Sequence, residues 1–274
     1  LANILRHMEI MQAIVLGIVQ GITEFLPVSS SGHLIFIPKI FGWQDQGILF
    51  DITVHVGTLL AVICFLRKRI ATLIQGFFST KKEYTKERRL AWFILISMVP
   101  TAIVGILVKT NNRSALVIGI SFIVWGVILG VADRYQAKRE RQHKIETETK
   151  DISFKQMSVM AIAQVIALIP GTSRSGITMT GGLFSHMSKK AAAEFSFLMS
   201  IPIIAAAGVL GVLDVSSHAM QSQDIFILII GLITSFVSAM IAMWGFMKVI
   251  SKWSYMPFVV YRVLVGIAIL AFLV

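Results

Sequence analysis

The chain has 274 residues, of which 56% are hydrophobic and only 14% are charged, and its mean hydropathy is +0.80. A soluble domain carries about a quarter charged residues, so this composition excludes a soluble globular protein and predicts a membrane protein with several spans. The 25 Lys and Arg outnumber the 14 Asp and Glu, for a net charge of +11, which we attribute to cytoplasmic loops and an anionic partner rather than to nucleic acid. The single cysteine, Cys64, excludes a disulfide framework and a thiolate metal cluster.

Six stretches have the apolar length of a membrane-spanning helix, which takes roughly 20 residues. In chain order they are residues 48–66, 90–108, 115–132, 195–213, 225–247 and 258–274. We predict that all six cross the membrane. Residues 1–7 precede Met8, a natural start residue, and we expect no function from them.

Two further apolar regions are interrupted in the middle. Residues 10–26 are followed by residues 27–32 (PVSSSG), and residues 153–169 by residues 170–176 (PGTSRSG). Proline ends a helix, and Ser and Gly supply turn and N-cap chemistry, so each region is predicted to be two helices joined by a break. The alternative is a pair of ordinary spans joined by a surface loop. The apolar run after each break has only about ten residues, which favours a re-entrant helical hairpin.

The distribution of Lys and Arg predicts the orientation. Residues 67–89 hold eight, residues 133–155 hold seven, and residues 189–190 and 248–252 hold two each, whereas residues 214–224 hold none. The positive-inside rule therefore places the basic segments in the cytoplasm and residues 214–224 outside. These assignments agree with the number of spans only if both broken regions are re-entrant. The first region then enters from outside and the second from the cytoplasm.

Each half of the chain then contains one re-entrant hairpin and three spans, and because three is odd the second half is inverted. At an offset of 144, six residues of the first broken region match six of the second: Ile18, Gln20, Ile22, Ser29, Ser31 and Gly32 match Ile162, Gln164, Ile166, Ser173, Ser175 and Gly176. We predict an all-α polytopic membrane protein with one membrane domain. Residues 8–132 and 156–274 are its inverted repeats, residues 133–155 are a cytoplasmic linker, and the broken helices meet near the midplane to form a site.

Ionisable side chains at bilayer depth are candidates for function, because each costs about 2.5–3.5 kcal/mol there. Such residues are Glu24, His33, Asp51, His55, Arg174, Glu194 and Arg262. Gln20 and Glu24 are four residues apart and share the helix face next to the first break. His33 follows that break and Arg174 lies inside the second, so two breaks that meet would gather a carboxylate, an imidazole, a guanidinium and several hydroxyls.

These groups suit phosphoryl transfer. The helix N-termini after the two breaks favour an anion such as phosphate, and Arg174 can bind it through two hydrogen bonds. Ser30 can act as the nucleophile with His33 as general base and acid, while Glu24 can orient the histidine, accept a proton or bind a divalent cation. The alternative makes the serines N-caps, His33 a hydrogen-bonded interfacial residue and Glu24–Arg174 a structural ion pair. The occurrence of all these residues in two paired breaks favours catalysis.

The remaining ionisable residues carry less weight. Asp51 and Glu194 lie near the starts of spans, where an acid suits the helix dipole, so we predict structural roles. His55, one turn after Asp51, fits either a structural or a functional role. Arg262 is expected to extend its charged end to the cytoplasmic interface.

Residues 20–33 (QGITEFLPVSSSGH) and 170–178 (PGTSRSGIT) closely resemble the two signature motifs of the undecaprenyl-diphosphatase family, the bacitracin-resistance membrane phosphatases. The resemblance covers essentially the whole chain from Met8. It implies hydrolysis of undecaprenyl diphosphate to undecaprenyl phosphate and inorganic phosphate, which recycles the lipid carrier of peptidoglycan synthesis and gives bacitracin resistance. It also implies a multi-pass protein of the bacterial plasma (inner) membrane, with an inverted-repeat fold and an active site that opens to the extracytoplasmic side.

Combining the motifs with the chemistry above gives the candidate site. The candidate catalytic residues are Glu24, Ser30, His33 and Arg174, and the candidate substrate-binding residues are Gln20, Ser29, Ser173, Ser175 and Thr178. The family often has Glu at the position of Gln20, so Glu24 is the one predicted metal ligand, for Mg²⁺ or Ca²⁺. No organic cofactor is expected.

The sequence leaves some alternatives open and argues against others. Either Ser30 or His33 could be the nucleophile. Inverted repeats with broken helices also suit a transporter or flippase of undecaprenyl phosphate, although transport does not need the nucleophile, base and arginine together. An anion channel is disfavoured because Arg174 is not part of a basic pore lining. An unrelated lipid-phosphatase superfamily is excluded, because it needs an Arg-Pro pair, which the sequence lacks, and a second histidine, whereas position 180 is Thr. The expected partners are a polyprenyl diphosphate lipid and the membrane, and a dimer is compatible.

Overall fold

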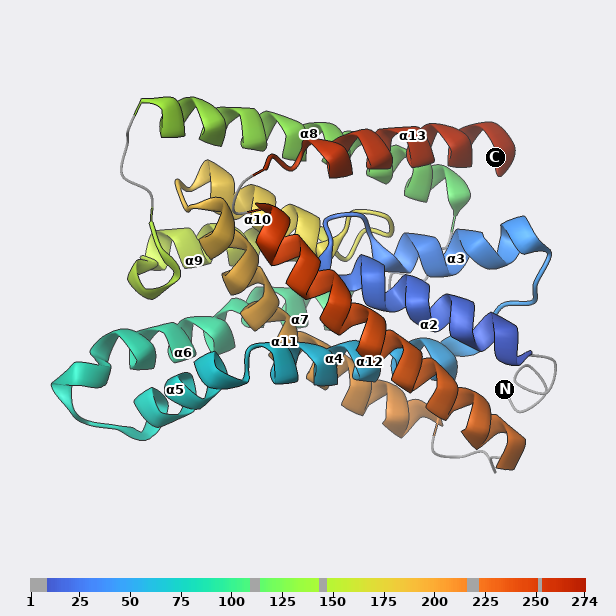
Figure 1. Cartoon of the computed structure of the whole chain (residues 1–274), viewed down its shortest axis with the longest axis horizontal. Coiled ribbons are helices and arrows are strands. Elements are labelled where there is room, and N and C mark those ends of the chain that lie inside the picture. Colours follow the sequence, from blue (N-terminus) through green and yellow to red (C-terminus); the bar gives the residue numbers. More distant parts are fainter. Residues whose placement is uncertain (1–8, 109–113, 143–146, 216–221, 251–252) are drawn as a thin grey trace.

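The computed structural model describes residues 9–108, 114–142, 147–215, 222–250 and 253–274, with side chains omitted at 212–215 and 222–224. Every regular element in these ranges is helical (Figure 1). The first half contains α2 (Ile10–Phe25), α3 (Ser30–Phe41), α4 (Gly47–Phe65), α5 (Arg67–Phe78), η1 (Lys82–Tyr84), α6 (Thr85–Ser97), α7 (Val99–Leu107) and α8 (Ala115–Arg141). The second contains η2 (Thr149–Asp151), α9 (Phe154–Ile166), α10 (Arg174–Phe184), α11 (Lys189–Val215), α12 (Ser222–Ile250) and α13 (Met256–Phe272).

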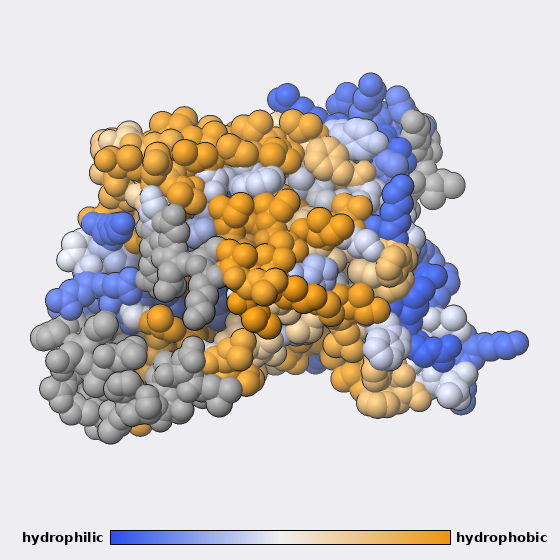
Figure 2. All heavy atoms as spheres, turned by 180° about the vertical axis from the view of Figure 1, so that it is seen from behind, coloured by the Kyte–Doolittle hydropathy of each residue, from blue (hydrophilic) through white to orange (hydrophobic). Residues whose placement is uncertain are grey.

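Five stretches of helix are long and apolar enough to cross a membrane, judged by length and composition among the described residues. They are Gly47–Phe65, Lys82–Leu107, Ala115–Arg141, Lys189–Gly211 and Ile225–Ile250. The sixth predicted span corresponds to α13, an apolar helix of 17 residues. Figure 2 shows a broad hydrophobic band with hydrophilic residues gathered toward the two sides of the view. The helices and this surface agree with an all-α polytopic membrane protein.

Both broken regions form the predicted pairs of helices. In the first, α2 ends at Phe25 and α3 begins at Ser30; in the second, α9 ends at Ile166 and α10 begins at Arg174. The second predicted span is also interrupted, because α6 ends at Ser97 and α7 begins with a proline in its first turn.

Two segments predicted as cytoplasmic loops contain more helix than expected. Residues 67–78 form α5, which packs against α6 to make a helical hairpin at one end of the molecule (Figure 1). Leu73 and Gly76 are buried on its inner face, a helical spacing that the dense positive charge of this segment obscured. In addition, α8 continues to Arg141, through the first part of the predicted linker, where Asp133 accepts hydrogen bonds from Ser254 Oγ and the backbone N–H of Tyr255.

The helices of the two halves interlock through small residues. α12 packs against both α2 and α4, α4 packs against α11, and α8 packs against α13. A Cβ atom at Gly21 would lie 2.4 Å from the Ser235 carbonyl oxygen, and one at Gly57 would lie 2.6 Å from the Leu232 carbonyl oxygen. Small residues allow this close approach of helix backbones, which is how helices associate in lipid.

We expect Gly21→Ala to lower the free energy of unfolding by about 1–3 kcal/mol, because the added methyl group forces α2 away from α12. Gly245→Ala on α12 is the matched control, since a Cβ atom there meets nothing within 4 Å. Thermal melting of the purified variants in detergent measures the difference. Equal melting temperatures would contradict the close packing at Gly21.

Candidate functional site

A strained serine precedes the second helix of each broken region. Ser29 has φ 73° and Ser173 has φ 72°, in the left-handed region that residues other than glycine rarely adopt. Each lies directly before the first residue of its helix, α3 or α10. Such strain persists only where the surrounding structure enforces it, and it is often found at functional sites.

The two breaks meet in the middle of the molecule, as Figure 1 shows. Ser175 Oγ donates a hydrogen bond of 2.8 Å to the carbonyl oxygen of Leu26. Gly171, with φ 84°, allows the second break to pass close to α8, because a Cβ atom there would lie 2.8 Å from the Ile118 carbonyl oxygen. The predicted meeting of the breaks is therefore confirmed.

Arg262 of α13 holds the two breaks together through hydrogen bonds. Its side chain is fully buried and donates to five backbone carbonyl oxygens, at distances of 2.9–3.2 Å. The acceptors are Pro27 of the first break, Gly171 and Thr172 of the second, and Ser121 and Phe122 of α8. The expectation that Arg262 extends to the membrane interface is wrong. Carbonyl groups at helix breaks have no helical partner, and away from water a protein donor must satisfy them.

Glu24 and Arg174 form the charged centre of the site. Arg174 Nη2 lies 2.7 Å from Glu24 Oε1, and the two side chains are 14% and 7% exposed. The other carboxylate oxygen, Oε2, accepts hydrogen bonds from Ser30 Oγ at 2.6 Å and Gln20 Nε2 at 2.9 Å. Arg174 Nη1 also donates to the Ser196 carbonyl oxygen of α11 at 3.2 Å. The carboxylate, the guanidinium and a hydroxyl thus meet as the sequence predicted.

His33 faces another direction. Its Nδ1 donates to the Ser29 carbonyl oxygen at 2.7 Å, since a carbonyl can only accept, and its Nε2 is 2.6 Å from the Tyr261 hydroxyl. The ring stacks on Tyr261 and also contacts Phe36 and Phe122. Both ring nitrogens are occupied, so the structure does not bring His33 to the carboxylate of Glu24.

The imidazole beside Glu24 belongs instead to His55 of α4. His55 Nε2 lies 3.6 Å from Glu24 Oε2, while its Nδ1 donates to the Asp51 carbonyl oxygen at 2.6 Å. The sequence could have pointed to His55, because Asp51 and His55 are ionisable residues one turn apart in a span with no other charged residue.

The other predicted residues mainly support the two breaks. Ser173 Oγ accepts from the Gly176 backbone N–H at 3.1 Å and caps α10, and Thr178 Oγ1 is 2.7 Å from Ser196 Oγ. Ser29 Oγ is 3.4 Å from Ser31 Oγ. Gln20 is fully buried, and its Oε1 has no hydrogen-bond partner among the described residues.

The two acids predicted to be structural have protein partners. Glu194 lies 3.4 Å from Arg69 Nε and accepts from Thr149 Oγ1 at 3.0 Å. Asp51 accepts from Gln46 Nε2 at 2.6 Å. Glu194 thus joins α11 to α5 and η2, away from Glu24.

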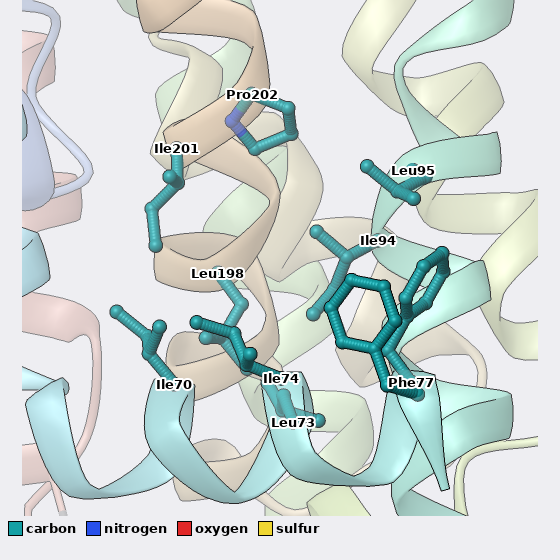
Figure 3. Close-up of a pocket in the computed structure, with 11 residues that line it drawn as sticks. Ile70, Leu73, Ile74, Phe77, Ile94, Leu95, Leu198, Ile201 and Pro202 are labelled. Carbon is teal, nitrogen blue, oxygen red and sulfur yellow. The ribbon is translucent and has the colours of Figure 1, made fainter.

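A groove between α4 and α11 reaches this centre. It encloses about 360 Å³ and is lined by Glu24, Ile48, Asp51, Ile52, His55, Ile203, Ile204, Ala207 and Gly208. A second cavity, of about 260 Å³, lies among α5, α6 and α11, but its lining, which runs from Ile70 of α5 to Pro202 of α11, is wholly apolar (Figure 3). The groove at Glu24 is the candidate site because it joins apolar surface to ionisable groups.

The protein's own groups do not form a closed metal site. Within the described ranges, no three His, Cys, Asp or Glu side chains are grouped to hold a metal ion. Both oxygens of Glu24 already have partners, as described above. One carboxylate together with substrate phosphates and water is nevertheless a common way to hold Mg²⁺, so the residues fit a cation shared with a phosphorylated substrate.

The chain matches the family model described as bacitracin resistance protein BacA over residues 13–268. It is 43% identical to an undecaprenyl-diphosphatase of Alteromonas mediterranea, over 97% of this chain and 99% of that protein. It is 44% identical to an undecaprenyl-diphosphatase of Aliivibrio salmonicida, over 97% of this chain and 99% of that protein, and 43% identical to one of Hahella chejuensis, over 96% and 98%.

We expect Arg262→Lys to lower the free energy of unfolding by at least about 2 kcal/mol. A lysine ammonium has three donors, so at least two of the five hydrogen bonds are lost, and a hydrogen bond from a charged donor contributes about 1.5–3 kcal/mol. Arg67→Lys, at an exposed position on α5, is the control and should change little. Denaturant titration in detergent measures the free energy of unfolding of both variants. An unchanged value for Arg262→Lys would refute the proposal that Arg262 holds the two breaks together.

Proposed function

The chain belongs to the bacitracin resistance protein BacA family, and we propose that it is an integral membrane phosphatase that hydrolyses undecaprenyl diphosphate. The products are undecaprenyl phosphate and inorganic phosphate, so the reaction recycles the lipid carrier of peptidoglycan synthesis and gives bacitracin resistance. The observation that carries this proposal is the contact of one carboxylate, Glu24, with both Arg174 and Ser30 where the two breaks meet. The names of the relatives favour this phosphatase over a lipid transporter.

The geometry supports Ser30 as the nucleophile and Glu24 as its base. Arg174 binds the terminal phosphate and neutralises charge that develops on it. As Ser30 Oγ attacks the terminal phosphorus, Glu24 takes the hydroxyl proton, the bond from phosphorus to the bridging oxygen breaks, and undecaprenyl phosphate leaves with that electron pair. Water then attacks the phosphorylated serine. Its hydroxyl group goes to inorganic phosphate, its other proton goes to solvent, and Glu24 returns a proton to Ser30 Oγ.

We assign His33 a positioning role. Its hydrogen bond to the Ser29 carbonyl oxygen stabilises the strained conformation of Ser29, the residue before Ser30. Its contacts with Tyr261 hold the start of α3 against α13. The occupation of both ring nitrogens supports Ser30 over His33 as nucleophile.

We include a divalent cation, Mg²⁺ or Ca²⁺, in the proposal. Glu24 would hold it together with the phosphate oxygens of the substrate, and it would neutralise part of the diphosphate charge. The fully buried Gln20 keeps Glu24 in place by its hydrogen bond of 2.9 Å and adds no second carboxylate.

The inverted-repeat architecture is part of the same proposal, with repeats at residues 8–132 and 156–274 joined by residues 133–155. Equivalent elements begin at an offset of 144: α2 and α9 at Ile10 and Phe154, and α3 and α10 at Ser30 and Arg174. The strained serines before α3 and α10 have the same offset and nearly equal φ angles. Such agreement of backbone conformation supports duplication more strongly than six identical residues do.

We place the protein in the bacterial inner membrane with the groove open to the extracytoplasmic side. The groove is lined by Ile48, in the first turn of α4, and by Gly208, toward the end of α11. The basic residues lie at the opposite ends of these helices, in residues 67–69 and 189–190. Since basic segments stay in the cytoplasm, this arrangement supports an outward-facing groove.

We expect Ser30→Ala and Arg174→Ala each to lower phosphate release by at least about 10²-fold, as loss of a nucleophile or of a transition-state donor does. The matched controls are Arg67→Ala, at the start of α5, and Ser79→Ala, directly after its last residue. Substrate labelled on the terminal phosphate should also label Ser30 during turnover, as peptide mass spectrometry can detect. Label on His33 would contradict the assignment of the nucleophile, and full turnover by Arg174→Ala would contradict the phosphatase site.

A further inference from the structure

The groove between α4 and α11 has two unlike sides. The α4 side carries the ionisable residues Asp51 and His55, one helical turn apart, besides Ile48 and Ile52, and is called the polar side. The largely buried Glu24 also lines the groove. The α11 side, from Ile203 to Gly208, presents only apolar side chains and a glycine. A polar side facing an apolar side suits an amphiphile whose anionic head and hydrocarbon chain lie next to each other.

His55 is the residue on the polar side that reaches the catalytic centre. Its side chain is 32% exposed, compared with 7% for Glu24. The hydrogen bond from Nδ1 to the Asp51 carbonyl oxygen fixes the ring, so Nε2 faces both Glu24 and the open groove. Of the described side chains that contact the Glu24 carboxylate, His55 is the one that lines the groove.

The apolar side lies within reach of the same centre. Arg174 is hydrogen-bonded to the Ser196 carbonyl oxygen, two turns before Ile203 on α11. A phosphate held by Arg174 therefore lies beside α11, and a chain that leaves it can run along Ile203, Ala207 and Gly208. Ala207 and Ile48 are exposed on the surface of the molecule, so the groove is open to its surroundings.

We propose that the α4–α11 groove binds the lipid diphosphate lengthwise, with the diphosphate against His55 and the first isoprene units against α11. This proposal rests on the proposed phosphatase function, to which it adds a phosphate-contacting residue and a path for the lipid chain. His55 is then a catalytic residue outside the two sequence motifs. Gly208 lines this path. A Cβ atom there would make only an ordinary contact of 3.7 Å with Val56 Cγ2, whereas a much larger side chain would enter the groove.

The position of the chain can be tested without turnover. A polyprenyl diphosphate with a photoreactive diazirine in its first isoprene unit is cross-linked to the purified wild-type protein, and the labelled peptide is identified by mass spectrometry. Label on α11 at residues 203–208 is the expected result. Label between α2 and α12, where Ile22 and Val237 line another apolar groove, would overturn the proposal even if the protein is a phosphatase.

Steric variants test the path during turnover. We expect Gly208→Trp to lower kcat/KM at least tenfold for undecaprenyl diphosphate and much less for isopentenyl diphosphate, which has a single isoprene unit. Leu210→Trp is the matched control, because Leu210 lies on the same helix and is 60% exposed. Equal losses for the two substrates, or equal effects of the two tryptophans, would overturn the path.

His55 variants test the phosphate contact. We expect His55→Leu to lower kcat/KM at least tenfold for both diphosphates with an unchanged melting temperature, and His55→Gln, whose amide can donate to phosphate, to recover most of the loss. A loss in His55→Leu that follows a lower melting temperature, or no recovery in His55→Gln, would overturn the role of His55. Absence of turnover in the wild type would instead refute the phosphatase function, and the cross-link would still report where the chain lies.

Discussion

The structure depends on the hydrogen bonds of one buried guanidinium. Each helix break exposes backbone carbonyl groups that no helix satisfies, and here they lie beside the fully buried Arg262, away from water. Arg262 supplies donors to three such carbonyls, in both breaks at once, and to two more in α8. Because one rigid planar group makes all these bonds, the two breaks are fixed relative to each other and to α8. A lysine could not replace this geometry.

The position of the reactive groups follows from that fastening. With the breaks held together, Ser30 at the start of α3 and Arg174 at the start of α10 both reach the carboxylate of Glu24. The left-handed conformations of Ser29 and Ser173 direct the two helix starts toward this point, and they persist because surrounding hydrogen bonds compensate for the strain. Preorganisation of this kind fixes the backbone around these groups before a substrate binds.

The sequence predicted the parts of this design that depend on local chemistry. Pro, Ser and Gly located both breaks, and the scarcity of charge in the spans singled out Glu24 and Arg174. The sequence could not predict which way a side chain on a short helix points. His33 turns toward Tyr261, whereas His55, from a separate helix, faces Glu24. It also could not show that Arg262 faces other helices rather than lipid, because an apolar span has similar residues on all sides. Helix α5 was missed because its positive charge masked an apolar face.

Arg262 and Arg174 have different hydrogen-bond partners, and this difference separates the structural role of Arg262 from the proposed catalytic role of Arg174. Arg262 is surrounded by neutral carbonyl dipoles from five residues, so an incoming anion would have to break the backbone contacts of both breaks to reach it. Arg174 is paired with a carboxylate and one carbonyl group, and a diphosphate can replace the carboxylate with a stronger anionic partner. If that exchange releases Oε1 of Glu24 from Arg174, Oε2 would keep its hydrogen bond to Ser30 and could accept the hydroxyl proton. Substrate binding would therefore activate the nucleophile while the fastening of the breaks stays intact.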